Sequence, residues 1–156
     1  SAPHATGGSH RAERGEVAGR GGLHAPGGRP RPEEAPAFAV APGVDALAVG
    51  VGSSHAMTER TAELDLALIG DIRARVGVPL VLHGSSGVPD AGLVAAVRAG
   101  MTKINIATHL NSVFTAAVRS RLAQDHRLVD TRRYLGPARE AVQAEAARLL
   151  ELVALR

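Results

Sequence analysis

Three apolar segments of this chain each end in small or polar residues, and each is followed by a stretch with helical periodicity. The segments are residues 44–55, 78–83 and 103–108, and the first two end in His55 and His83. Near-continuous apolar strands that alternate with helices are typical of a parallel sheet covered by helices. Because parallel strands end at the same edge of a sheet, their terminal polar residues are expected to meet there. The sequence therefore predicts an α/β fold with a site at the carboxyl edge of the sheet.

The spacing of apolar residues places the helices. One helix is expected to begin at Thr58, one at Asp90 with its end at Gly100, one near residues 110–122, and a last one at Pro137. Three such strand–helix units are too few to close an eight-stranded barrel. Residues 1–36 carry many of the Gly and Pro residues with little apolar periodicity, so we expect an irregular or disordered segment there, followed by one domain over residues 37–156.

Composition excludes several classes of function. The 156 residues include no cysteine, so any metal would be held by His or carboxylate groups, and a reducing, cytoplasmic location is favoured. The net charge of +3 is spread along a chain with only 2% aromatic residues, which argues against a nucleic-acid surface. No apolar run is long enough to cross a bilayer, so no membrane partner is expected.

The segment that follows His83 combines two kinds of ligand chemistry. Gly84, Ser85 and Ser86 form a small-residue turn, and Pro89 and Asp90 then open a helix. A histidine at a strand end can be a metal ligand, and the turn can present backbone N–H groups to an anion. A strand-end histidine is also common as a packed core or capping residue, so the residues alone leave both interpretations open.

Three motifs in the same order and spacing resemble the C-terminal half of the class II, zinc-dependent fructose- or tagatose-bisphosphate aldolases. Residues 48–55 match an apolar strand ending in small residues and His. Residues 82–89 match Leu-His-Gly-(Gly/Ser)-Ser-Gly-(Ile/Val)-Pro, and residues 103–108 match Lys-(Ile/Val)-Asn-(Ile/Val)-x-Thr. The resemblance covers residues 43–155 and implies strands six to eight of a TIM (β/α)8 barrel, preceded by an irregular N-terminal segment.

The resemblance implies a site and a reaction. It assigns zinc ligation to His55 and His83, and binding of substrate and its phosphate to Gly84, Ser85, Ser86, Asn105, Ile106, Ala107 and Thr108. In the family, zinc acts as a Lewis acid on dihydroxyacetone phosphate in the reversible cleavage of a ketose 1,6-bisphosphate, which also yields glyceraldehyde 3-phosphate. Such lyases belong to glycolysis and carbohydrate metabolism, and they are usually homo-oligomers.

Two expected parts of that site are missing from this sequence. The family's third zinc histidine and its proton-transferring aspartate lie in the first half of the barrel, and no His-x-Asp-His pattern occurs here. No catalytic residue is therefore assigned. Because catalytic zinc normally takes three protein ligands, we expect a fragment with little or no aldolase activity alone, prone to self-association.

Two alternatives stay open. The chain is either the C-terminal half of an aldolase catalytic domain, or a non-catalytic relic, a half-barrel that binds phosphorylated ligands. A different phosphate-binding α/β enzyme is a remote third option, which would require the histidines to be dispensable. The choice between fructose and tagatose bisphosphate is not encoded in these motifs, since the residues on the aldehyde side lie mostly outside them.

Overall fold

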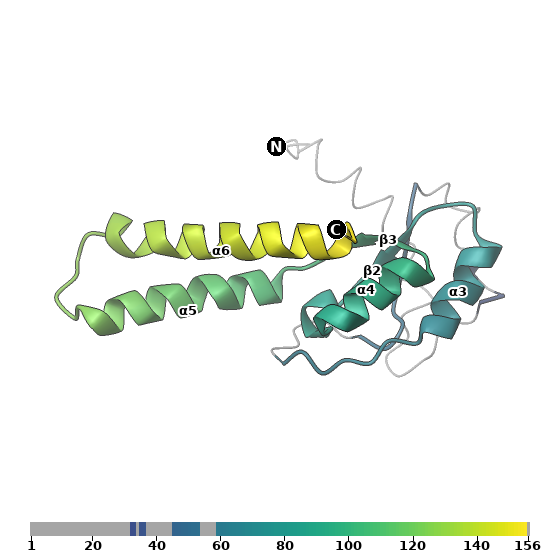
Figure 1. Cartoon of the computed structure of the whole chain (residues 1–156), viewed down its shortest axis with the longest axis horizontal. Helices are drawn as coiled ribbons and strands as arrows, with labels where there is room; N and C mark the ends of the chain where they lie inside the picture. The colour runs from purple at the N-terminus through teal and green to yellow at the C-terminus, as the bar shows by residue number, and fades with distance from the viewer. Residues whose placement is uncertain (1–31, 34, 37–44, 54–58, 156) are drawn as a thin grey trace, which may run out of the picture.

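The sheet has three parallel strands in the order β1-β2-β3, each pair joined by a helix (Figure 1). The computed structural model describes residues 32–33, 35–36, 45–53 and 59–155. Its elements are β1 (Leu47–Val49), α3 (Leu66–Arg75), β2 (Leu80–Leu82), the 3-10 turn η2 (Ser85–Gly87), α4 (Asp90–Ala99), β3 (Met101–Ile104), α5 (Thr108–Gln124) and α6 (Arg132–Val153). The predicted α/β class with a parallel sheet is confirmed. The irregular segment expected over residues 1–36 lies almost entirely outside the described residues, as does His55. The helix expected to begin at Thr58 begins at Leu66 instead, since residues 59–65 are not helical.

The strands differ in burial according to their place in the sheet. Every residue of β1 and β2 is buried, in agreement with their unbroken aliphatic sequences. In β3 only Met101 is buried, while Thr102 and Lys103 are exposed. The third strand was predicted at residues 103–108, which is wrong by two or more residues at each end. The pairing of β2 with β3 shifts between Leu80 and Val81, and the chain leaves the sheet after Ile104 to enter α5.

Local capping groups set the ends of α3 and α4. The Asp65 carboxylate accepts a hydrogen bond from the backbone N–H of Leu68 at 3.0 Å and thereby caps α3, which begins at Leu66. The side chain of Leu66 is 41% exposed. α4 matches its predicted bounds, from Asp90 to the residue before Gly100. Gly100 has a φ of +123°, a conformation that favours glycine and ends the helix.

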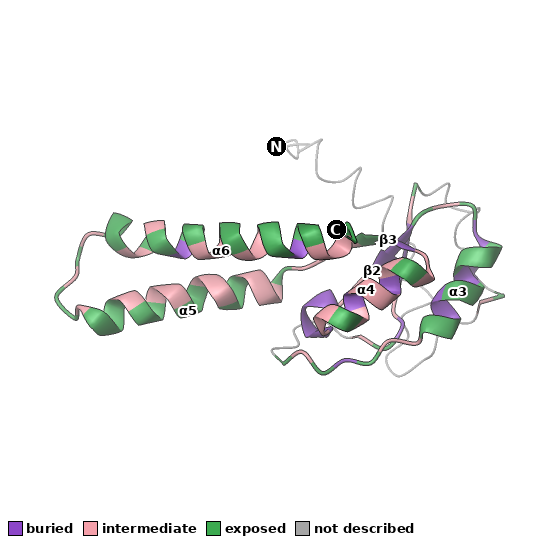
Figure 2. Cartoon of the chain, in the orientation of Figure 1, coloured by how far each residue is buried: buried purple, intermediate pink, exposed green. Residues whose placement is uncertain are grey.

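The last two helices form an antiparallel hairpin that projects from the sheet (Figure 1). α6 begins at Arg132, so the prediction of a start at Pro137 is wrong, and Pro137 lies inside the helix. Leu150, although apolar, is 68% exposed. Figure 2 shows exposed and half-buried residues along most of both helices, because each has mainly the other as its neighbour. A helix packed against one neighbour buries a narrower stripe than a helix packed on a sheet.

The core lies between the sheet and the helices and is built from aliphatic side chains. Leu47, Val49, Leu80, Leu82, Ile69 and Leu93 are fully buried in it. From the hairpin, Leu149 joins this core and Leu152 packs against it, as do Leu110 and Ile106 near the start of α5. The base of the hairpin is thereby fixed to the sheet next to its carboxyl edge. None of the described helices is long and apolar enough to span a bilayer.

The stability of the β1 end should depend on Gly52. It has a φ of +110°, and a Cβ added there would lie 2.2 Å from the carbonyl oxygen of Glu63. We expect Gly52→Ala to lower the free energy of unfolding by about 2 kcal/mol, measured by urea unfolding followed by circular dichroism. Gly70→Ala is the control, since nothing lies within 4 Å of its added Cβ in α3 and it should stabilise by about 0.5–1 kcal/mol. Equal unfolding midpoints for the two variants would contradict this account.

Candidate functional site

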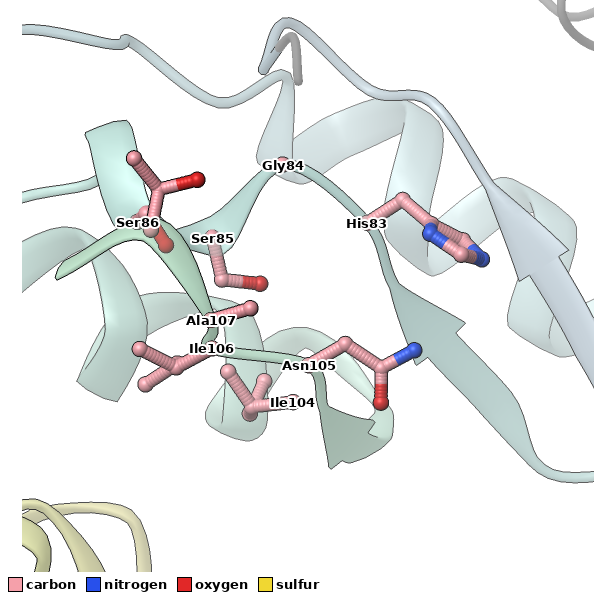
Figure 3. A pocket seen from close by; sticks show the side chains of 9 residues that line it. His83, Gly84, Ser85, Ser86, Ile104, Asn105, Ile106 and Ala107 are labelled. Carbon is pink, nitrogen blue, oxygen red and sulfur yellow. The ribbon is translucent and has the colours of Figure 1, made fainter. Parts of the chain in front are cut away.

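A cavity of about 400 Å³ opens at the carboxyl edge of the sheet. This volume lies within the range of small-molecule sites, roughly 300–1,000 Å³. Figure 3 shows its two walls, the turn after β2 and the segment after β3, facing each other. The lining residues are His83, Gly84, Ser85, Ser86, Ile104, Asn105, Ile106, Ala107 and Thr108. Every residue predicted to contact substrate or phosphate lines this one cavity.

The first wall is a tight turn held by its own hydrogen bonds. Gly84 has a φ of +67°, in the left-handed region, which sends the chain directly into η2. The Ser85 hydroxyl donates to the carbonyl oxygen of Leu82 at 3.0 Å, and the backbone N–H of Val88 donates to the carbonyl of Ser85 at 3.0 Å. Ser85 and Ser86 are both buried. The two serines therefore shape the turn as well as face the cavity.

The second wall joins the sheet to the start of α5. The backbone N–H of Asn105 donates to the carbonyl of Leu82 at 3.2 Å, which extends the pairing of β2 and β3 by one bond. α5 then begins at Thr108, and the backbone N–H of His109 donates to the Ser86 hydroxyl oxygen at 3.1 Å. The N-terminus of a 17-residue helix borders the cavity and gives it a partial positive charge.

His83 lies at the end of β2 and is half-buried at the cavity wall (Figure 3). Its carbonyl oxygen accepts a hydrogen bond from the Ser53 hydroxyl, which connects the ends of β1 and β2. His55 lies outside the described residues. Among the residues that the structure describes, no group of three or more His, Cys, Asp or Glu side chains could hold a metal ion. The His83 imidazole has the chemistry of a zinc ligand, but the described residues do not complete a zinc site.

An ion-pair network that is connected to the cavity through His109 and Ser86 was missed by sequence reasoning. His109 Nε2 lies 2.6 Å from Glu145 Oε1, and Arg148 Nη2 lies 2.7 Å from the same carboxylate. Arg148 also pairs with Asp90, and Arg60 Nη2 lies 2.6 Å from Asp90 Oδ1. We call these five residues the ion-pair network. Its only local signal was the Glu145–Arg148 spacing of three residues in one helix, which is common on solvated helix faces.

The arginines of the network hold its carboxylates in the charged form. The hydrogen bond from Arg148, with a further one from His109, lowers the pKa of Glu145 to about 2. The hydrogen bond from Arg148 and then that from Arg60 also lower the pKa of Asp90 below its ordinary value. Both carboxylates are therefore ionised at neutral pH, and the two pairs of opposite charges compensate one another.

The family model of the class II fructose-bisphosphate aldolases matches residues 2–155. The chain belongs to this family. The match extends well upstream of residues 43–155, where the motifs carry the resemblance. The matched region includes all the residues that line the cavity. The family is one of lyases.

Solved aldolase structures share the fold. The YdjI aldolase from Escherichia coli K12 is 32% identical, with a TM-score of 0.66 over 79% of this chain and 44% of that one. The fructose-bisphosphate aldolase from Campylobacter jejuni is 18% identical, with a TM-score of 0.67 over 80% of this chain and 45% of that one, and shows the fold alone. This chain spans less than half the length of either aldolase structure.

The ion-pair network should make the stability of the protein depend on pH in the acid range. Glu145 has an ordinary pKa of 4.5 when unfolded and a pKa of about 2 when folded. Its contribution is therefore fully present above pH 4.5 and is lost as the pH falls toward 2. We expect Glu145→Gln to remove about 1–2 kcal/mol of this pH-dependent stability, a value reduced by the exposure of Arg148.

Urea unfolding at pH 6, 4 and 2.5 measures this effect. Glu151→Gln, on an exposed position of the same helix, is the matched control and should keep the dependence of the wild type. If the free energy of unfolding of Glu145→Gln decreases as steeply as that of the wild type when the pH is lowered from 6 to 2.5, that result contradicts a pH-dependent contribution from the contact of Glu145 with Arg148 and His109.

Proposed function

We propose that this chain is the C-terminal portion of a class II aldolase barrel, strands six to eight, and that its cavity binds the phosphate of the dihydroxyacetone phosphate moiety. The observation that carries this proposal is the cavity itself. Residues of two separate sequence motifs, 82–89 and 103–108, line it together at adjacent strand ends. In (β/α)8 barrels, phosphate sites are commonly formed by the loops after strands seven and eight.

The donors around the cavity fit a phosphate group. The N–H groups of Ser85, Ser86 and Thr108 have no acceptor within their own helical turns, and both turns border the cavity. The next N–H of α5, that of His109, already donates to the Ser86 hydroxyl. Helix N-termini stabilise anions through such N–H groups and the helix dipole. The nine lining residues include no arginine or lysine. Recognition would therefore rest on backbone N–H groups and hydroxyls rather than on a positively charged side chain.

We propose that His83, together with His55, contributes two ligands to the zinc ion of this enzyme family. His83 lines the same cavity as the residues proposed to bind phosphate. Zinc supplies Lewis-acid chemistry for the substrate carbonyl when bound. Since catalytic zinc normally takes three protein ligands, we propose that this chain alone cleaves ketose bisphosphates weakly or not at all.

The complete activity would be reversible cleavage of a fructose or tagatose 1,6-bisphosphate to dihydroxyacetone phosphate and glyceraldehyde 3-phosphate. Within this proposal the protein acts in carbohydrate metabolism in the cytoplasm, where a cysteine-free chain is well suited, and as a homo-oligomer. The second candidate is a non-catalytic half-barrel that binds phosphorylated ligands. It is favoured by one observation: the phosphate-related residues gather in one cavity, whereas the described residues that line it include no carboxylate.

Inorganic phosphate should bind in the cavity. In a titration of the 15N-labelled chain, we expect the amide resonances of residues 84–86 and 107–109 to shift together with a millimolar dissociation constant. Gly84→Ala should weaken binding at least threefold, because a side chain at a φ of +67° strains the turn by about 1 kcal/mol. Gly77→Ala, with nothing within 4 Å of its added Cβ, should bind as the wild type does. A wild-type chain whose amides at these positions do not respond to phosphate would contradict the proposed function.

Zinc binding should depend on His83 independently of phosphate. We expect His83→Ala to weaken zinc binding at least tenfold in a competition titration with a chromogenic chelator, while phosphate still shifts the amides of residues 84–86. His126→Ala is the control, because His126 is exposed in the connection between α5 and α6. Equal zinc affinity in the wild type and in both variants would remove His83 from the metal site and favour the different phosphate-binding enzyme.

A further inference from the structure

His109 links the cavity to the C-terminal helix. Its backbone N–H donates to the hydroxyl oxygen of Ser86 in one cavity wall, at 3.1 Å. Its ring atom Nε2 lies 2.6 Å from Oε1 of Glu145 on α6. The side chains of His109 and Glu145 are only 21% and 18% exposed. One residue in the first turn of α5 therefore contacts both the η2 turn and α6.

The other end of the network returns to the same turn. Arg148 holds Glu145 and reaches across to Asp90, the first residue of α4. Arg60 also pairs with Asp90, and its Nε donates to the carbonyl oxygen of Val88 at 2.9 Å. The contacts thus run from Ser86 through His109, Glu145, Arg148, Asp90 and Arg60 to Val88, two residues beyond Ser86. They enclose the η2 turn from both sides.

The start of α5 needs such support. No residue of α5 is fully buried, and the helix packs mainly on α6 in the projecting hairpin (Figure 2). Its orientation relative to the turn is therefore set at its base, where Leu110 packs against the core and His109 contacts Glu145 and Ser86. A binding site loses affinity when its donors move by even about 0.5–1 Å.

We propose that His109 and Glu145 are positioning residues, which hold the N-terminus of α5 against the η2 turn and thereby set the affinity of the cavity for a phosphate group. This inference rests on the proposed function, because it concerns the cavity assigned to phosphate. Neither side chain lines the cavity, so both act through Ser86 and the first turn of α5.

The test compares phosphate affinity in matched variants of the full chain, using inorganic phosphate as the probe and the amide shifts of residues 84–86 as the readout. We expect His109→Ala and Glu145→Ala each to weaken binding three- to tenfold. His109→Gln places a side-chain amide donor near the position of Nε2 and should restore the affinity to within twofold of the wild type. The double variant His109→Ala with Glu145→Ala should be no weaker than either single variant, because both remove the same contact.

Other outcomes separate this inference from the proposed function. If the wild type binds no phosphate, the proposed function fails. If the wild type binds phosphate and His109→Ala binds equally well, or His109→Gln loses as much affinity as His109→Ala, only the positioning role is overturned. Where His109→Ala does not fold, Glu145→Ala against the exposed control Glu151→Ala gives the same comparison, and equal affinity of those two variants overturns the role.

Discussion

The carbonyl oxygen of Leu82 is the acceptor on which both the sheet edge and the cavity depend. It receives the backbone N–H of Asn105 at 3.2 Å and the hydroxyl of Ser85 at 3.0 Å. A carbonyl has two lone pairs, so both bonds can form together. The first holds the segment after β3 beside β2, and the second folds the turn after β2 back onto the strand. The two walls of the cavity are therefore fixed relative to each other through one atom of a fully buried residue.

The parts of this arrangement that sequence predicted are those in which local chemistry and burial agree. The aliphatic residues of β1 and β2 have a single environment that suits them, between helices in a parallel sheet. Asp90 and Gly100 mark the ends of α4 by helix-terminal preferences that do not depend on distant contacts. The strand ends gather at one edge because the sheet is parallel, which places the motif residues around one cavity before any side-chain contact is considered.

The features that sequence did not predict depend on which helix faces a neighbour. Leu150 and Leu149 are adjacent and identical in type, yet Leu149 joins the core and Leu150 is largely exposed. The difference comes from the hairpin, which presents one narrow stripe of α6 to α5 and to the sheet. Pro137 was interpreted as a helix start, but residues from Arg132 onward already form the first turns of α6. Neither choice can be made from periodicity alone, because each depends on the partner helix. The same limit hid Glu145 and its contact with His109 across two helices.

The proposed phosphate site would bind its anion without an arginine or lysine among the described lining residues, and the ion-pair network adds no net charge of its own. Arg60 and Arg148 are paired with Asp90 and Glu145, which compensate their charges. What remains near the cavity is the partial positive charge of backbone N–H groups at the starts of η2 and α5. A backbone N–H group stabilises an anion only at short range and only when it points toward the anion. Binding of this kind therefore depends on the orientation of the N–H groups more than on net charge. In the proposed phosphate site, the αL turn at Gly84 and the placement of α5 by His109 are therefore part of the binding chemistry, although neither contributes a charged group to the cavity.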